Sequence, residues 1–136
     1  MVGDKNMKHS INIKDNLPFV QLKIIHSDKK LLLDNVLIDT GSAKSILKEK
    51  LVEIIDIKPE PEDILGSVRG VGGVEYVYIK QVDLLELNGI CVKNFEVDIG
   101  EMDYGFEIDG IIGMDFLIET NSIIDLNNLI IKTKEE

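Results

Sequence analysis

Short apolar runs separated by turn residues are the feature that most limits what this chain can fold into. Val20, Leu22 and Ile24 lie two positions apart, which places their side chains on one face of a strand. The stretch 82–99 continues this alternation around a predicted turn at Asn88-Gly89. Ile, Leu and Val dominate the apolar residues and tryptophan is absent, so strands are favoured over a helical bundle. We predict an all-β fold of many short strands.

Turn and helix signals divide the rest of the chain. Apolar residues between Ser45 and Ile57 fit one helical stripe, so we predict one short helix there. Pro59 and Pro61 then end any helix and indicate an exposed loop. The last apolar segment, SIIDLNNLIIKT, predicts two short strands. Further polar turns are predicted at Asp15-Asn16, at 26–30 and at Asn127-Asn128.

The length of 136 residues, 44% of them hydrophobic, suits one domain with a substantial core. We predict that this domain spans residues 10–136 and follows an N-terminal extension at residues 1–9. No apolar run reaches the roughly 18 residues of a membrane-spanning helix. We therefore expect no membrane association.

The charge and the single cysteine exclude several classes of protein. Fifteen Lys and Arg against twenty-five Asp and Glu give a net charge of −10, which repels a phosphate backbone and argues against nucleic acid as a partner. Cys91 is the only cysteine, so an intrachain disulfide and a zinc site of several thiolates are excluded. We expect a cytoplasmic protein in which Cys91 is a buried, inert thiol of an apolar strand.

Five acidic residues gather before the last apolar runs. They lack the ligand spacing of a known calcium loop, so we predict a solvated acidic loop and no metal or cofactor. The five are Asp98, Glu101, Asp103, Glu107 and Asp109.

Asp39 is the strongest candidate for chemistry, because it directly follows the apolar run 36–38. A carboxylate at the end of a buried strand is costly unless hydrogen bonds or a shared proton compensate it. Gly41 allows the backbone to turn and bring amides close to the acid, while the hydroxyls of Thr40 and Ser42 can brace the turn. An ordinary strand-end turn is the alternative, since Asp, Gly and Ser are common in turns.

Three segments in a fixed order make the chain resemble the retropepsin-like aspartic proteases. VLIDTGS at 36–42 matches the D-T-G signature of that family, and DGIIGMDFL at 109–117 resembles its second signature. GVGG at 70–73 lies between them, where the family carries a glycine-rich flap. The resemblance spans about 17–132 and is closest to single-domain cellular and bacterial members, including the retropepsin domain of DNA-damage-inducible proteins. The acidic stretch 100–109 departs from the family pattern.

The resemblance implies a closed acid-protease β-barrel with one or two short helices, assembled as a homodimer. The chain has one D-T-G, so the second catalytic aspartate would be Asp39 of another copy of the chain. Thr40 would form a hydrogen bond across the two-fold axis, with Gly41 and Ser42 supporting the acid. Gly113 would lie close beneath the D-T-G loop, where a side chain would displace that loop.

The implied function is an aspartic endopeptidase that cleaves an extended peptide. Two facing carboxylates that share one proton would activate water. The flap residues Gly70, Val71, Gly72 and Gly73 would cover the bound peptide. The alternative is a peptide-binding or dimerisation module with the same fold and no proteolysis. A second copy of the chain and a peptide or protein substrate are the expected partners.

Overall fold

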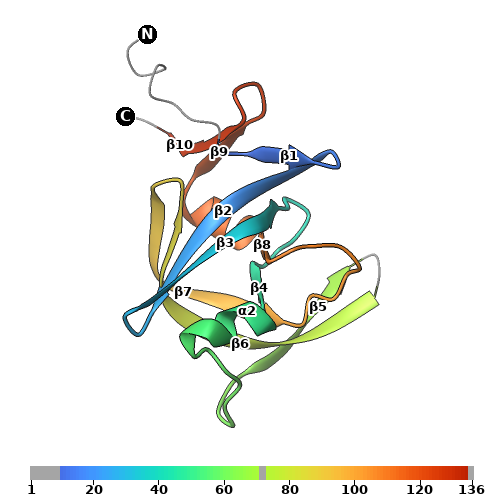
Figure 1. Ribbon diagram of the computed structural model, residues 1–136, viewed down its shortest axis with the longest axis vertical. Helices are drawn as coiled ribbons and strands as arrows, with labels where there is room; N and C mark the ends of the chain where they lie inside the picture. The colour runs from blue at the N-terminus through green and yellow to red at the C-terminus, as the bar shows by residue number, and fades with distance from the viewer. Residues whose placement is uncertain (1–9, 71–72, 135–136) are drawn as a thin grey trace.

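Strands make up most of the computed structural model, which describes residues 10–70 and 73–134 (Figure 1). Three short helical segments interrupt the strands of this part of the chain. In chain order the elements are β1 (Asn12–Lys14), β2 (Leu17–His26), β3 (Lys29–Ile38), β4 (Ile46–Lys48), α2 (Glu49–Val52), η1 (Glu53–Ile55), β5 (Leu65–Gly70), β6 (Gly73–Leu87), β7 (Ile90–Gly100), β8 (Gly110–Ile112), α3 (Met114–Glu119), β9 (Ser122–Asp125) and β10 (Ile130–Thr133).

Eight strands form one sheet in the order β1-β2-β3-β8-β4-β7-β6-β5, and β2 also pairs with β6. The sheet therefore curls until the long strands β2 and β6 meet (Figure 1). Most pairs are antiparallel, but β3 pairs in parallel with β8 and β4 pairs in parallel with β7. β9 and β10 form a separate antiparallel pair. This mostly β architecture with a few short helices confirms the predicted class.

Three hairpins have two-residue turns in which both residues adopt positive φ. This conformation matches the right-handed twist of the flanking strands, and Asn, Asp and Gly adopt it most readily. The predicted turns at Asp15-Asn16 and Asn88-Gly89 are confirmed, with φ of 52° and 62° in the first and 51° and 82° in the second. Ser27 and Asp28 form the third turn, at the predicted polar segment. These turns set the register of β1–β2, β2–β3 and β6–β7.

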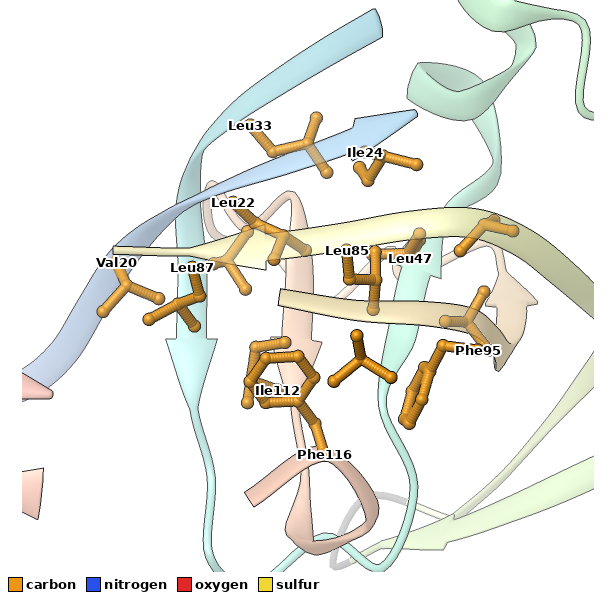
Figure 2. Close-up of a cluster of buried hydrophobic side chains, with 14 of the residues drawn as sticks. Val20, Leu22, Ile24, Leu33, Leu47, Leu85, Leu87, Phe95, Ile112 and Phe116 are labelled. Carbon is orange, nitrogen blue, oxygen red and sulfur yellow. The ribbon is translucent and has the colours of Figure 1, made fainter. Parts of the chain in front are cut away.

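The main core lies inside the curled sheet. Figure 2 shows side chains from β2, β3, β4, β6, β7 and β8 converging on it together with Phe116 of α3. Phe116 is fully buried and meets Phe95 edge to face, with ring centroids 5.9 Å apart. Leu22, Leu47 and Leu85 are also fully buried. In the apolar run 36–38, Val36 and Ile38 are buried on one face of β3, whereas Leu37 on the other face is only partly buried.

A second, smaller apolar cluster lies beside the β5–β6 hairpin. It contains Ile46 of β4, Val77 of β6, and Met102 and Ile108 from the loop between β7 and β8. Met102 and Ile108 are 0% and 1% exposed. This loop, residues 101–109, is thus anchored at both of its ends.

The predicted helix from Ser45 to Ile57 is only partly correct. Ile46–Lys48 form strand β4, which pairs with both β7 and β8. The α-helix covers only Glu49–Val52 and continues as the 3₁₀ turn η1. The helical spacing of the apolar residues could not reveal that β7 and β8 leave a gap in the sheet that Ile46 and Leu47 fill.

The prediction for Cys91 is wrong, because this residue is exposed. Along β7 its neighbours Ile90 and Val92 point into the core, so Cys91 takes the opposite, outward face. None of the helices among the described residues is long and apolar enough to cross a membrane.

A core substitution tests this packing. Leu85→Ala should lower the free energy of unfolding by about 2–5 kcal/mol, because it leaves a cavity in the fully buried core. Leu65→Ala is the matched control, since Leu65 is 79% exposed and should change stability by less than about 0.5 kcal/mol. Urea denaturation measures both, and equal losses would contradict the described core.

Candidate active site

Asp39 stands at the point where β3 leaves the sheet. Its backbone N–H donates to the carbonyl of Ile112 at 2.9 Å, one residue beyond the paired residues Ile38 and Ile112. The parallel β3–β8 pairing therefore continues to the acid itself. Residues 39–45, here called the Asp39 loop, then lead into β4.

The Asp39 loop folds back on the carboxylate. The N–H of Gly41 donates to Oδ1 of Asp39 at 2.9 Å, and the N–H of Ser42 donates to the Asp39 carbonyl at 3.1 Å. A Cβ on Gly41 would lie 3.2 Å from the same Oδ1, so a side chain there would crowd the carboxylate. Asp39 is half-buried, whereas Thr40 and Gly41 are exposed. The acid is thus braced by backbone but remains open to another molecule.

Gly113 lies directly against the Asp39 loop. A Cβ at this position would stand 2.5 Å from the Lys44 carbonyl oxygen and 2.8 Å from that of Ser42. Just after it, the N–H of Met114 donates to the Ser42 carbonyl at 2.7 Å. Because both obstacles are backbone atoms, only glycine fits without displacing the loop.

Ser45 and Asp115 form a hydrogen-bonded support that sequence reasoning missed. The Asp115 carboxylate accepts the N–H of Ser45 at 3.0 Å and its hydroxyl at 2.8 Å. The Ser45 Oγ in turn accepts the N–H of Gly113 at 2.9 Å. Ser45 is fully buried, so water cannot reach its polar atoms, and these bonds within the protein satisfy them instead. Both residues lie in or beside the two signature segments, which is the one signal that could have pointed to them.

Asp98 of β7 is a buried carboxylate next to this support. It is 4% exposed, and its backbone N–H donates to the Ser45 carbonyl at 3.1 Å. Burial raises the pKa of Asp98 above its usual value, Lys44 partly offsets this, and the neighbouring charge of Asp115 adds to it. The folded protein therefore holds the proton of Asp98 more tightly than the unfolded chain does.

The predicted solvated acidic loop holds for three of its five members. Glu101, Asp103 and Glu107 are exposed. The prediction is wrong for Asp98, which is buried in β7, and for Asp109, whose carboxylate accepts the N–H of Asn35 at 3.0 Å. Nowhere in residues 10–70 and 73–134 do three or more His, Cys, Asp or Glu residues gather in a way that could hold a metal ion.

The structure separates the candidate residues into two places. Gly41, Ser42 and Gly113 lie against Asp39 or its loop, and Thr40 adjoins them. Gly70 and Gly73 pair across the end of the β5–β6 hairpin. The other two predicted flap residues, Val71 and Gly72, lie outside the described residues.

Comparison with known proteins agrees with this geometry. Residues 21–116 match the family model described as aspartyl protease, and the chain therefore belongs to that family. The chain is also similar to the solved structure of EIAV protease complexed with the inhibitor HBY-793, with a TM-score of 0.59 and 21% identity over 82% of this chain and 95% of the EIAV chain. This similarity shows a shared fold. The family match and the shared fold together identify a retropepsin-like aspartic protease chain, as the sequence predicted. No curated protein matches it.

The close approach of Gly113 gives the first test of the site. Gly113→Ala should destabilise the protein by about 1–3 kcal/mol or more, because its methyl group collides with backbone. Gly66→Ala is the control, since its Cβ would find its nearest atom at an ordinary 3.6 Å. Chemical denaturation compares the two. A Gly113→Ala protein as stable as Gly66→Ala would contradict the described packing.

The raised pKa of Asp98 predicts a pH-dependent stability. The folded state holds this proton more tightly than the unfolded state, so ionisation of Asp98 opposes folding as pH rises from its ordinary pKa through the raised one. Asp98→Asn should therefore gain stability relative to the wild type across that window. The difference should be smallest at the acid end, where both side chains are neutral.

Asp125→Asn provides a comparison of opposite sign. Hydrogen bonds from Asn128 lower the pKa of Asp125 in the folded protein. Its ionised form is therefore the stabilising one, and Asp125→Asn should lose stability relative to the wild type as pH rises through the lowered pKa. Thermal unfolding from acid to neutral pH measures both differences. If both variants changed stability in the same direction relative to the wild type, the buried placement of Asp98 would be contradicted.

Proposed function

We propose that this chain is an aspartic endopeptidase whose active unit is a homodimer, with Asp39 of each copy forming the catalytic pair. The observation that carries the proposal is the braced but accessible Asp39 carboxylate, on a D-T-G loop that occurs once in the chain. Membership of the aspartyl protease family supports the reaction class. The proposed mechanism uses one ionised and one neutral carboxylate at the same moment, and the chain has one D-T-G, so a second copy would supply the other acid.

The proposed chemistry follows from two carboxylates that share one proton. Like charges about 3 Å apart cannot both be present, so one acid is ionised and the other neutral. The ionised Asp39 removes a proton from water as the water oxygen attacks the peptide carbonyl. The neutral Asp39 polarises that carbonyl and then gives its proton to the leaving nitrogen as the C–N bond breaks, so the pair still holds one proton at the end.

Two-fold symmetry would bring the Asp39 loops of two copies together on one axis. Thr40 is exposed beside the acid, which supports its proposed hydrogen bond to the other copy. The pairing of β2 with both β3 and β6 supports the proposed closed acid-protease barrel. We propose residues 10–136 as the protease domain; the extension 1–9 lies outside the described residues.

The proposed substrate is an extended peptide held between the Asp39 loops and the β5–β6 hairpins. An extended peptide can add to strand edges, so that backbone bonds provide affinity and side-chain pockets provide specificity. Gly70 to Gly73 are proposed as the flap that covers it. We also propose a reducing, cytoplasmic setting, which the free and exposed thiol of Cys91 supports.

The decisive test compares Asp39→Asn with Asp34→Asn in cleavage of a peptide library. Cleavage is measured from about pH 4 to 7 and should be fastest where the Asp39 pair holds one proton. Asp39→Asn should lose about 10²-fold or more in kcat, because it removes the group that takes the proton from water. Asp34→Asn should retain activity, since Asp34 is exposed on β3 and its carboxylate contacts Gln21 rather than the Asp39 loop. The mass in solution should correspond to a dimer.

Two outcomes would contradict the proposal. Cleavage that survives Asp39→Asn would show that another group, or a contaminant, performs the reaction. A folded wild-type dimer that binds peptides without cleaving them would favour the peptide-binding or dimerisation module instead.

A further inference from the structure

One carboxylate ties loop 101–109 to the β5–β6 hairpin. Glu75, on β6 two residues after Gly73, accepts the backbone N–H of Met102 at 2.7 Å through Oε2. Its Oε1 accepts the hydroxyl of Tyr104. Both oxygens of one side chain are thus committed to the loop that joins β7 to β8.

The position of Glu75 on the strand explains why it meets the loop. Side chains alternate along β6, so Glu75 shares its face with Val77, and the β5 residue opposite Glu75 is Val68. Val77 and Val68 pack in the small apolar cluster with Met102. The hairpin and the loop are therefore joined twice, by the apolar contacts of Val68 and Val77 and by the carboxylate of Glu75.

The end of β7 leaves space for this carboxylate. A Cβ on Gly100 would lie 2.9 Å from Oε2 of Glu75 and 2.8 Å from Cδ1 of Ile46. Glycine at this position thus lets the acid approach the backbone of the loop. Burial, together with the adjacent Glu75, strongly raises the pKa of Tyr104. The phenol therefore remains a hydrogen-bond donor to higher pH than an ordinary tyrosine would.

Loop 101–109 is also joined to β3, the strand that leads into Asp39. Its last residue, Asp109, exchanges hydrogen bonds with Asn35 of β3, through the Asp109 carboxylate at 3.0 Å and the Asp109 N–H at 2.8 Å. β8 follows at once and ends at Ile112, whose carbonyl accepts the Asp39 N–H. A continuous set of contacts therefore runs from Glu75 to the candidate catalytic acid.

We propose that Glu75 is a positioning residue that makes the β5–β6 hairpin and loop 101–109 move as one unit, held in register with the Asp39 loop. The inference rests on the proposed function for its consequence, which is that peptide binding depends on this link. Tyr104 and Phe106 lie 43% and 49% exposed on the loop. Their rings move with the hairpin, so an entering peptide meets hairpin and aromatic pair together.

Hydrogen exchange on the full chain tests the link without any substrate. Glu75→Gln and Tyr104→Phe should each speed amide exchange by about tenfold, in both the hairpin and loop 101–109, because each removes one of the hydrogen bonds that join them. The double variant should add little to either single change. Tyr76→Phe is the matched control, since Tyr76 is 82% exposed on the opposite face of β6 and should leave exchange unchanged.

Exchange that rises in only one of the two segments would overturn the coupling, as would an equal effect of Tyr76→Phe. Circular dichroism establishes that each variant is folded before exchange is compared. Tyr104→Phe removes a single oxygen atom, so it keeps the test available if Glu75→Gln fails to fold.

Kinetics on a cleaved peptide test the consequence for binding. Both variants should raise KM about threefold or more with little change in kcat, because a smaller fraction of the protein holds the hairpin in its binding position. Faster exchange with an unchanged KM would overturn the positioning role. If the wild type cleaves no peptide, the proposed function fails, and the exchange data alone then support or overturn the link.

Discussion

The parallel pairing of β3 with β8 is the interaction on which the candidate site depends. It places Asp39 one residue beyond a buried strand, with its N–H held by Ile112. The same strand leads into Gly113, whose missing side chain lets the Asp39 loop lie directly on it. A carboxylate so near the core is tolerated because the backbone N–H of Gly41 donates to it and one side remains accessible. The pairing of β3 with β8, two segments far apart in the chain, thus positions the Asp39 carboxylate, supports its loop and leaves the acid accessible.

The buried polar groups around this crossing show which physical effect dominates at each position. Ser45 is fully buried, yet its hydrogen bonds to Asp115 and Gly113 satisfy it, so it joins the two signature segments without a large desolvation cost. Asp98 is also buried, but none of the hydrogen bonds described for it reaches its carboxylate, so desolvation dominates and its pKa rises. The site thus holds the Asp98 carboxyl in an unfavourable environment beside the hydrogen-bonded network of Ser45, Asp115 and Gly113.

The acidic stretch that departs from the family pattern has a structural explanation. Met102 and Ile108 anchor loop 101–109 in a small apolar cluster, while Glu75 holds it from the hairpin. In a chain with a net charge of −10, another carboxylate close to Glu101 and Asp103 is unfavourable unless hydrogen bonds offset the repulsion. The two donors from the loop supply that offset, which makes the link specific to this pair of segments.

Local chemistry determined what the sequence alone could predict. The turns at Asp15-Asn16 and Asn88-Gly89, the alternating strands and the D-T-G loop at Asp39 each depend on residues adjacent in the chain. Tertiary structure decided which strands became neighbours. It drew Ile46 into the sheet instead of a helix, buried Asp98, turned Cys91 outward, and joined Ser45 to Asp115 and Glu75 to loop 101–109. These outcomes depend on contacts between segments distant in sequence, and periodicity along one segment carries no information about what will pack against it.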